Sequence, residues 1–215
     1  LKNGEYGVTV LSVSSEGQLL VGQYEDRQLH VYSAEGSHVT SINLPGTHLL
    51  KDAVWTRRGH IVYTATNYNN VSLITQRGDV ISQTKTLFPH CLSVSTDDVI
   101  YLADYRTGVY QSTDDGVTWS HVFDKAGLHV YDGWQCEQVI RVSSDSNTQV
   151  FWTSETSNSD ADKRCLRVYT VDNRQTDGSH VISQRDVALP RDVYMDTGSK
   201  LVYDGHTSIF ATDNF

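Results

Sequence analysis

The sequence predicts an all-β fold made of about five tandem units, each of four antiparallel strands. Three observations lead to this prediction: short strands that alternate apolar and polar residues, polar turns spaced about 40 residues apart, and prolines between the units. No stretch has the 3.6-residue periodicity of an amphipathic helix. Four-stranded units repeated at this spacing are typical of a β-propeller, in which each unit is one blade.

A polar turn closed by glycine joins the third and fourth strands of each predicted blade. These turns end at Gly36, Gly78, Gly116 and Gly178. The third strands before them are predicted at 29–32, 71–74, 108–111 and 166–169, and the fourth strands after them at 39–44, 80–87, 117–123 and 181–189. Glycine suits these turns because a tight hairpin needs a positive φ at one position.

A second series of turns, about 20 residues earlier in each unit, joins the first and second strands. They contain Glu16-Gly17, Arg58-Gly59, Asp97-Asp98, Ser146-Asn147 and Thr197-Gly198. Second strands follow them at 19–21, 61–63, 99–102, 150–152 and 201–203, and first strands precede them, as at 11–13 and 92–94. The two series together define four strands per blade.

The prolines set the boundaries between blades. Pro45, Pro89 and Pro190 fall between units, where a missing N–H removes no ladder hydrogen bond. The predicted blades span 1–44, 45–88, 89–123, 124–189 and 190–215 of a single domain, and the last stops at its third strand, 208–211. A propeller hides its edge strands only when it closes, so we predict part of a six-bladed ring completed by residues or a chain outside this sequence.

Composition narrows the class of partner. The net charge is −9, and the 17 basic residues are scattered, which disfavours a nucleic-acid-binding surface. No apolar run is long enough to span a membrane. The chain begins without a start methionine or a signal-like segment, so we expect it to derive from a longer precursor, and its compartment stays open.

One turn resembles a known family motif. Residues 112–119, Ser-Thr-Asp-Asp-Gly-Val-Thr-Trp, match the Asp-box of sialidase-like and sortilin-like propellers at every defined position. The resemblance implies a structural role for Ser112, Asp114, Gly116, Thr118 and Trp119: the aspartate bonds its own loop, and the tryptophan packs between blades. It implies nothing about activity, because the chemistry of that family lies on the opposite face.

The repeat as a whole resembles NHL-type blades, such as those at the C-terminus of tripartite-motif proteins. The segments that carry this resemblance are 16–22 and 29–36, and it extends over nearly the whole chain. The Asp-box and the long fourth unit depart from the NHL pattern. The resemblance implies a module that binds protein; a ligase activity is not implied, because no cysteine–histidine pattern of a RING or B-box is present.

Catalytic motifs are absent from the linear sequence. It contains no Gly-x-Ser-x-Gly, no phosphate-binding loop and no dinucleotide fingerprint. A sialidase needs clustered arginines, but Arg27, Arg106, Arg141 and Arg191 occupy different positions within their blades. We therefore predict that the chain is not an enzyme, with a sialidase-like glycoside hydrolase as the least favoured alternative.

Metals and cofactors are not predicted either. The nine histidines form no His-x-His or His-x₃-His pair, and Asp160 and Asp162 lack the glycine and glutamate of an EF-hand loop.

The polar segment from Thr153 to Lys163 is interpreted as a mobile insertion. Cys136 and Cys165 flank it, and either a disulfide or two thiols is compatible with their positions.

The favoured functional residues gather on one predicted face of the propeller. Loops between second and third strands and links between blades emerge together there, and they carry exposed aromatic and basic residues: Tyr24, Arg27, Tyr68, Tyr105, Arg106, Trp134 and His206. The tyrosines recur at nearly equal offsets in three blades; packing within their own loops is an equally good interpretation. We predict a module that binds a protein partner through this face, with a lectin-like, glycan-binding propeller as the alternative.

Overall fold

The computed structural model describes residues 8–24, 26–45, 49–65, 70–86, 88–104, 107–124, 134–144, 148–157, 164–172, 181–187, 201–203 and 209–211. Throughout these ranges the chain consists of strands and their connections, with no helix. The all-β class predicted from the sequence is confirmed.

Four antiparallel sheets of four strands follow one another along the chain, and a pair of strands follows them. The first blade comprises β1 (Val8–Val13), β2 (Leu19–Gln23), β3 (Gln28–Tyr32) and β4 (His38–Asn43). The second comprises β5 (Leu50–Trp55), β6 (Ile61–Ala65), β7 (Asn70–Ile74) and β8 (Val80–Lys85). The third comprises β9 (Pro89–Val94), β10 (Ile100–Asp104), β11 (Gly108–Ser112) and β12 (Ser120–Asp124). The fourth comprises β13 (Trp134–Ser144), β14 (Thr148–Ser157), β15 (Arg164–Asp172) and β16 (Val181–Val187), and β17 (Leu201–Tyr203) pairs with β18 (Ile209–Ala211).

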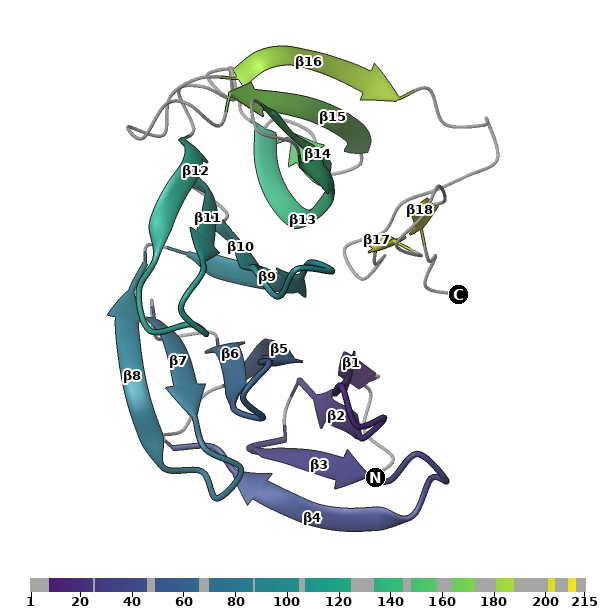
Figure 1. Cartoon of the computed structure of the whole chain (residues 1–215), viewed down its shortest axis with the longest axis vertical. Helices are drawn as coiled ribbons and strands as arrows, with labels where there is room; N and C mark the ends of the chain where they lie inside the picture. The colour runs from purple at the N-terminus through teal and green to yellow at the C-terminus, as the bar shows by residue number, and fades with distance from the viewer. Residues whose placement is uncertain are drawn as a thin grey trace.

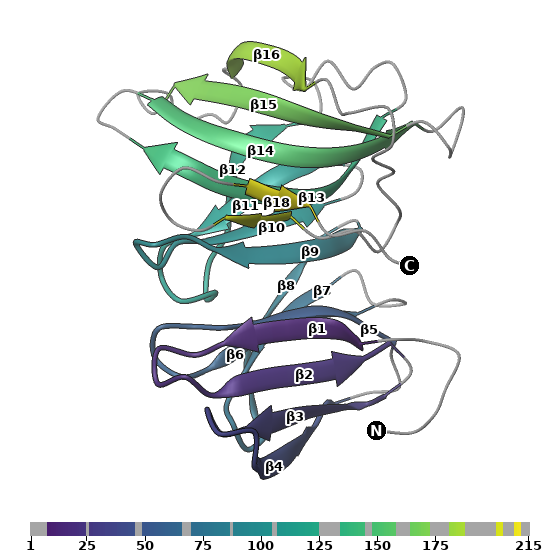
Figure 2. The same cartoon turned by 90° about the vertical axis from the view of Figure 1, so that its right-hand side faces the viewer.

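The sheets stand side by side along an arc, with the first strand of each blade innermost and the fourth outermost (Figure 1). Seen from the side, the strands run roughly parallel to the axis of the arc (Figure 2). Two faces result. The turn face carries the turns between first and second and between third and fourth strands, and the link face carries the connections between second and third strands and between blades. This arrangement is a partial β-propeller.

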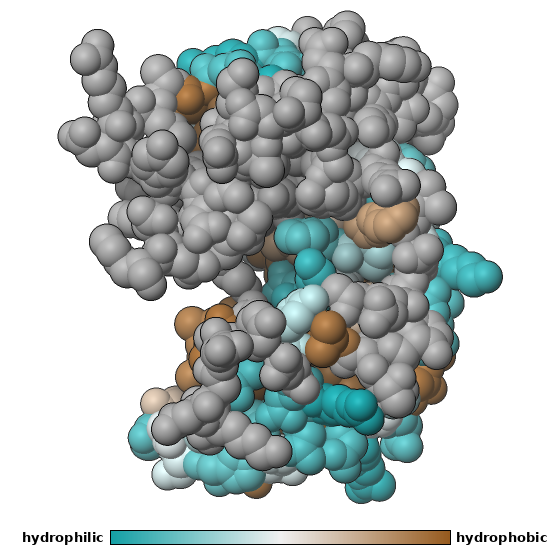
Figure 3. Space-filling model, turned by 180° about the vertical axis from the view of Figure 1, so that it is seen from behind, coloured by the Kyte–Doolittle hydropathy of each residue, from teal (hydrophilic) through white to brown (hydrophobic). Residues whose placement is uncertain are grey.

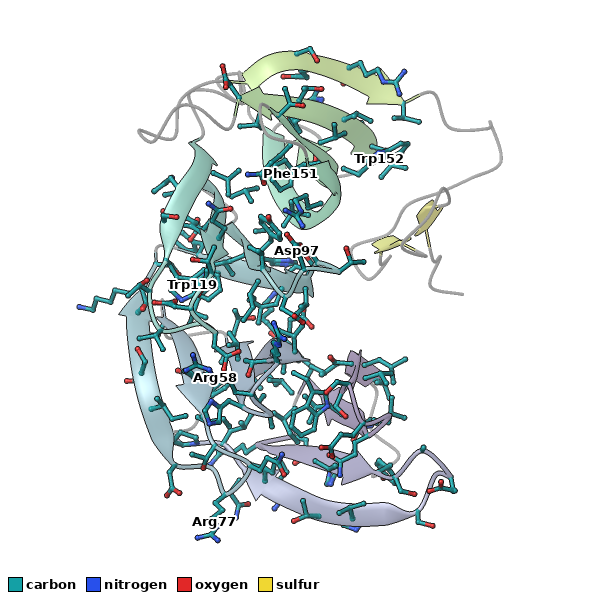
Figure 4. All side chains as sticks on the ribbon, in the orientation of Figure 1. Arg58, Arg77, Asp97, Trp119, Phe151 and Trp152 are labelled. Atoms are coloured by element: carbon teal, nitrogen blue, oxygen red, sulfur yellow. The ribbon has the colours of Figure 1, made fainter. Side chains whose placement is uncertain are left out.

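Each described blade packs against the next through apolar side chains. One core lies between the first and second blades and includes Leu20, Val31, Trp55 and Ile61. Equivalent cores join the second blade to the third and the third to the fourth. In the fourth blade, consecutive residues of β14 diverge: Phe151 points toward the third blade and stacks edge-on against Tyr101 at 5.2 Å, whereas Trp152 points away (Figure 4).

The predicted turn glycines that the structure describes adopt the expected backbone, while Gly178 and Gly198 lie outside the described residues. Gly17, Gly36, Gly59, Gly78 and Gly116 all have φ between 74° and 90°. Asp98 takes the position of Gly59 in the third blade with φ 65°. Aspartate tolerates this conformation better than most residues, which explains why a non-glycine residue occurs there.

Two boundaries differ from the sequence prediction. The fourth strand of the third blade begins at Ser120 and not at Val117, because residues 113–119 form a longer turn. The insertion predicted from Thr153 to Lys163 does not begin at Thr153: residues 153–157 extend β14, Thr153 is buried and pairs with Arg167 of β15, and residues 158–163 lie outside the described residues. The polar composition concealed a strand whose inward alternation continues through Phe151 and Thr153.

The register of the fourth blade decides between the alternatives for two cysteines. Cys136 of β13 and Cys165 of β15 both lie opposite Glu155 of β14, one on each side of it. Two strand spacings of about 4.8 Å separate their backbones by roughly 10 Å. A disulfide needs Cα atoms within about 7 Å, so this register does not permit a Cys136–Cys165 bond.

Candidate binding face

On the link face, backbone hydrogen bonds hold the connection between β2 and β3 against the start of the second blade. The Leu50 N–H donates to the Tyr24 carbonyl at 3.1 Å, which ties this connection to the second blade. The Leu44 N–H donates to the Arg27 carbonyl at 2.8 Å, and the Asp26 N–H donates to the Gln23 carbonyl at 3.1 Å. Tyr24, Asp26 and Arg27 are therefore each held by a main-chain hydrogen bond, which orients their side chains.

The connection carries an aromatic ring and charges of both signs, Asp26 and Arg27, and a lysine of the next blade lies next to the ring. Arg27 is exposed and Tyr24 is half-buried. The ammonium of Lys51, on the innermost strand β5, lies 5.9 Å from the centre of the Tyr24 ring, which is within range of a cation–π interaction. Lys51 was not among the predicted site residues; its position next to Tyr24 depends on how the blades pack.

Two buried carboxylates organise the same face in the second and third blades. Asp104, at the end of β10, accepts from the Phe88 N–H at 2.8 Å and from the Thr107 N–H at 3.0 Å. Asp52 of β5 accepts from its neighbour Ala53 at 2.9 Å and from the Leu92 N–H of β9 at 2.8 Å. Both aspartates therefore cap the backbone and are not available as exposed contact residues, although Asp104 directly precedes the predicted contact residues Tyr105 and Arg106.

The other predicted contact residues are only partly located. Tyr68, Tyr105, Arg106 and His206 lie outside the described residues. Trp134 was predicted to lie in a loop, but it is the first residue of β13, where its backbone pairs with Ser157. It thus begins an innermost strand at the link face. Tyr24 and Arg27 are the predicted residues that the structure describes with side chains.

Asp52 and Asp104 were missed as structural groups, and each leaves a weak signal in the sequence. Asp104 closes the apolar run Ile100-Tyr101-Leu102-Ala103, and a carboxylate directly after a buried strand is suited to accept N–H groups of the following turn. Asp52 is a single charge within the strand 50–55. Its Leu92 partner is 40 residues away, so only the packed blades reveal the pair.

The opposite, turn face holds the segment that matches the Asp-box. The Asp114 carboxylate accepts from the Thr118 N–H at 2.8 Å, from the Thr118 hydroxyl at 2.6 Å and from the Ser112 hydroxyl at 2.9 Å. Ser112 in turn accepts from the Gly116 N–H at 2.8 Å. Burial raises the pKa of Asp114, but these hydrogen bonds, those of Thr118 first, outweigh it and hold the pKa below its usual value. Trp119 is half-buried against the core between the second and third blades (Figure 4).

Polar contacts at the turn face also join neighbouring blades. Arg57 of the second blade lies 3.3 Å from Asp98 of the third. Arg141 of the fourth blade pairs with Asp97 of the third and lies over the Tyr101 ring, with 5.6 Å between the guanidinium carbon and the ring centre. Burial lowers the pKa of Arg141 from its ordinary value. These contacts bind blades to each other, and we assign them to structure.

The described residues include no group of three or more His, Cys, Asp and Glu side chains placed to hold a metal ion. Within the same part of the chain, no helix has the length and apolar character needed to cross a bilayer.

No protein-family model matches the sequence, and no curated protein is similar to it in sequence. Solved structures do resemble the fold. The Dos1 propeller is 12% identical, with a TM-score of 0.60 over 87% of this chain and 62% of its own. The gluconolactonase XC5397 of Xanthomonas campestris is 12% identical, with a TM-score of 0.60 over 96% of this chain and 69% of its own. YCF48 bound to a D1 peptide is 10% identical, with a TM-score of 0.54 over 73% of this chain and 50% of its own.

These comparisons show the β-propeller fold, and the chain spans about three fifths of the length of the Dos1 propeller. They also overturn one prediction. The chain was predicted not to be an enzyme because its linear sequence holds no catalytic motif, yet a gluconolactonase is among the propellers that it resembles. In a propeller, residues from several blades converge on one face, so the absence of a linear motif does not exclude catalysis.

Proposed function

We propose that this propeller is a binding module whose link face contacts a segment of a partner protein. The observation that carries the proposal is the geometry around Tyr24: its ring lies next to Lys51, Arg27 is exposed on the same connection, and the backbone of both residues is hydrogen-bonded to the two ends of the link between the first and second blades. Tyrosine and arginine on a rigid frame are typical of the residues that dominate protein interfaces.

Two further facts support a protein segment as the ligand. A propeller of similar fold, YCF48, has been solved with a peptide bound. The local charges also bear on the ligand: the chain carries −9 overall, whereas Lys51 lies beside Tyr24 and Arg27 is exposed on the same connection. An acidic group of a partner segment would pair with Lys51 or Arg27.

We further propose that the blades are of NHL type and that residues 112–119 are a structural Asp-box. The hydrogen bonds around Asp114 support the second assignment, because both carboxylate oxygens accept from residues of the same turn. Under this assignment the turn face contributes to stability and the link face contributes to binding.

Site-specific photo-crosslinking tests the proposed function. A photoreactive amino acid replaces Arg27 on the link face or, as the matched control, Arg77, an exposed arginine in the β7–β8 turn on the other face (Figure 4). In extract from the source cells, position 27 should crosslink to a protein that position 77 does not capture. With that protein purified, R27A should slow association and weaken its salt dependence, whereas R77A should leave both unchanged.

The opposite pattern would contradict the proposal. If position 77 captures the partner and position 27 does not, the binding face is the turn face. If the purified protein binds with the same rate constants to wild type and R27A at low salt, Arg27 does not belong to the interface.

A further inference from the structure

We propose that one face of the first blade is the surface on which the propeller closes, and that its occupant is a further four-stranded blade of the same polypeptide. We call the side of a blade that is turned toward the blade before it in the chain its leading face. The leading faces of the second and third blades are covered by the preceding blade, whereas no described blade covers that of the first.

The strand register identifies the leading face of each blade. Residues directly opposite in antiparallel strands share a side of the sheet, so each face consists of rows across the four strands. The leading rows of the second blade are Ala53–Tyr63–Ser72–Gln83 and Trp55–Ile61–Ile74–Val80. The corresponding rows of the first blade are Leu11–Val21–His30–Ser41 and Val13–Leu19–Tyr32–His38.

Innermost positions in these rows are apolar in the first three blades, and the preceding blade covers them in the second blade and, except at the rim, in the third. Ala53 and Trp55 are 1% and 4% exposed against the first blade. In the third blade, Leu92 is 5% exposed, and Val94 at the rim is 40% exposed. The corresponding Leu11 and Val13 are 62% and 64% exposed. Figure 3, which views the molecule from behind, shows hydrophobic side chains beside the opening of the arc in its lower half.

The outer half of the leading face has a second feature in common among the first three blades. A side chain of the third strand contacts a side chain of the fourth strand, and the two are polar or aromatic. In the second blade the Gln83 amide donates to the Ser72 hydroxyl at 3.2 Å, and in the third the rings of Tyr110 and His121 are in tilted contact, with 3.9 Å between their centres. In the first blade His30 and Ser41 are 2.8 Å apart, and His30 also contacts Asp26 at 3.1 Å. The leading face of the first blade thus has the apolar inner and polar outer halves of a face that meets another blade.

The turn glycines show the same difference. A Cβ at Gly78 would lie 2.8 Å from the Asn43 carbonyl oxygen of the first blade, and one at Gly116 would lie 2.6 Å from Val62 of the second. Each turn therefore packs onto the blade before it. At Gly36, the corresponding turn of the first blade, a Cβ would meet nothing within 4 Å.

The repeat identifies the occupant as a blade, since the covered faces all meet a four-stranded sheet with aliphatic residues such as Leu20, Leu29 and Val31. The same polypeptide is its source, because the first, second and third blades follow one another through links as short as residues 44–49 and 86–88. The Dos1 propeller, of which this chain covers 62%, shows that a propeller of this kind has length for further blades.

The test measures accessibility in the whole polypeptide as it is made in its source. Leu11→Cys and Val13→Cys, introduced one at a time, are treated with N-ethylmaleimide, and peptide mass spectrometry follows each site apart from the native cysteines. The matched control is Val80→Cys on β8, a strand that lies outermost in its blade, where Val80 is 46% exposed. We expect positions 11 and 13 to react at least roughly tenfold more slowly than position 80, because a docked blade must open before they react.

Equal reaction rates at positions 11, 13 and 80 would overturn the proposal. Protection that disappears on dilution would also overturn it, because the occupant would then be a second chain. Hydroxyl-radical footprinting of the unsubstituted protein gives a second readout that needs no variant: oxidation of Leu11 and Val13 should be slow relative to Val80, and equal oxidation would likewise refute the closing blade.

Discussion

Asp115, in the turn between β11 and β12, accepts a hydrogen bond of 2.9 Å from the hydroxyl of Thr56, in the turn between β5 and β6 of the neighbouring blade. His60 of the second blade lies 3.5 Å from the same carboxylate oxygen. Asp115 holds a positive φ of 68°, an uncommon conformation for a residue with a side chain. The interaction therefore joins two blades through a residue whose backbone is unusual.

A double-mutant cycle measures this contact. We expect T56V and D115G each to lower the free energy of unfolding, with a coupling of about 1 kcal/mol between them. Glycine at 115 removes backbone strain, but that effect is the same with threonine or valine at position 56 and cancels in the cycle. T56S, which keeps the hydroxyl, is the control and should retain most of the coupling. Additive effects of T56V and D115G in urea titrations would show that the hydrogen bond contributes nothing.

Asp104 should be sensitive to a change of one atom. In D104N one carboxylate oxygen becomes an NH₂ group, which cannot accept from the Phe88 or the Thr107 N–H. Because Asp104 is buried, one backbone donor loses its partner, and we expect a loss of about 1–3 kcal/mol in unfolding free energy. D79N, at an exposed turn position, is the control. Equal stabilities of D104N and D79N in chemical denaturation would contradict the capping role.

The repeat was predictable because its signals are local. Turn glycines and alternating strands depend on residues within about ten positions of each other, so the turns at Gly36 and Gly78 were located correctly. The start of β12 was misplaced by three residues, because Val117 has strand propensity but the bonds of Asp114 extend the turn. The end of β14 was missed because burial of Thr153 depends on the neighbouring blade.

The candidate site was predictable only as a face. Tyr24 and Arg27 lie where the blade pattern places them. The contact of Lys51 with Tyr24 and the bond from Leu92 to Asp52 join residues of different blades, and no local pattern specifies them. The prediction that the chain is not an enzyme relied on the absence of linear catalytic motifs. That absence is a poor guide in a propeller, because residues of several blades can meet on one face.

Trp119 should contribute to stability through its volume and not through its ring nitrogen. The Nε1 atom is buried and has no hydrogen-bond partner among the described residues, while the ring packs between the second and third blades. W119F should therefore cost only about 1 kcal/mol. W119A should cost about 3 kcal/mol, the lower end for a core tryptophan, because the side chain is half-buried. If W119F destabilises as much as W119A in thermal unfolding, the nitrogen has a partner and this interpretation is wrong.

The lowered pKa of Asp114 predicts that the free energy of unfolding depends on pH. Its pKa in the folded chain is below the usual value of 3.8, so the unfolded state binds more protons in this range. The stabilisation is present above that usual value and is lost as the pH falls through the lower, folded value. The difference in unfolding free energy between wild type and D114N should therefore shrink as the pH falls from about 5 to about 2.5. A difference that is constant over this range would show that the charge of Asp114 does not matter.

Alanine substitutions at three turn glycines would separate the free-energy cost of backbone strain from the cost of a steric collision. Alanine at Gly36, Gly78 or Gly116 meets a positive φ each time, which costs about 1 kcal/mol. Only at Gly78 and Gly116 does the added methyl group also collide with the preceding blade. G36A should therefore lower the free energy of unfolding by about 1 kcal/mol, and G78A and G116A by at least about 1 kcal/mol more. G78A is the more informative variant, because it collides with a backbone oxygen that cannot rotate away, whereas the Val62 methyl near Gly116 belongs to a side chain. Urea unfolding of the three variants side by side measures these differences, and a G36A as unstable as G78A would mean that the turn at Gly36 is also packed in solution.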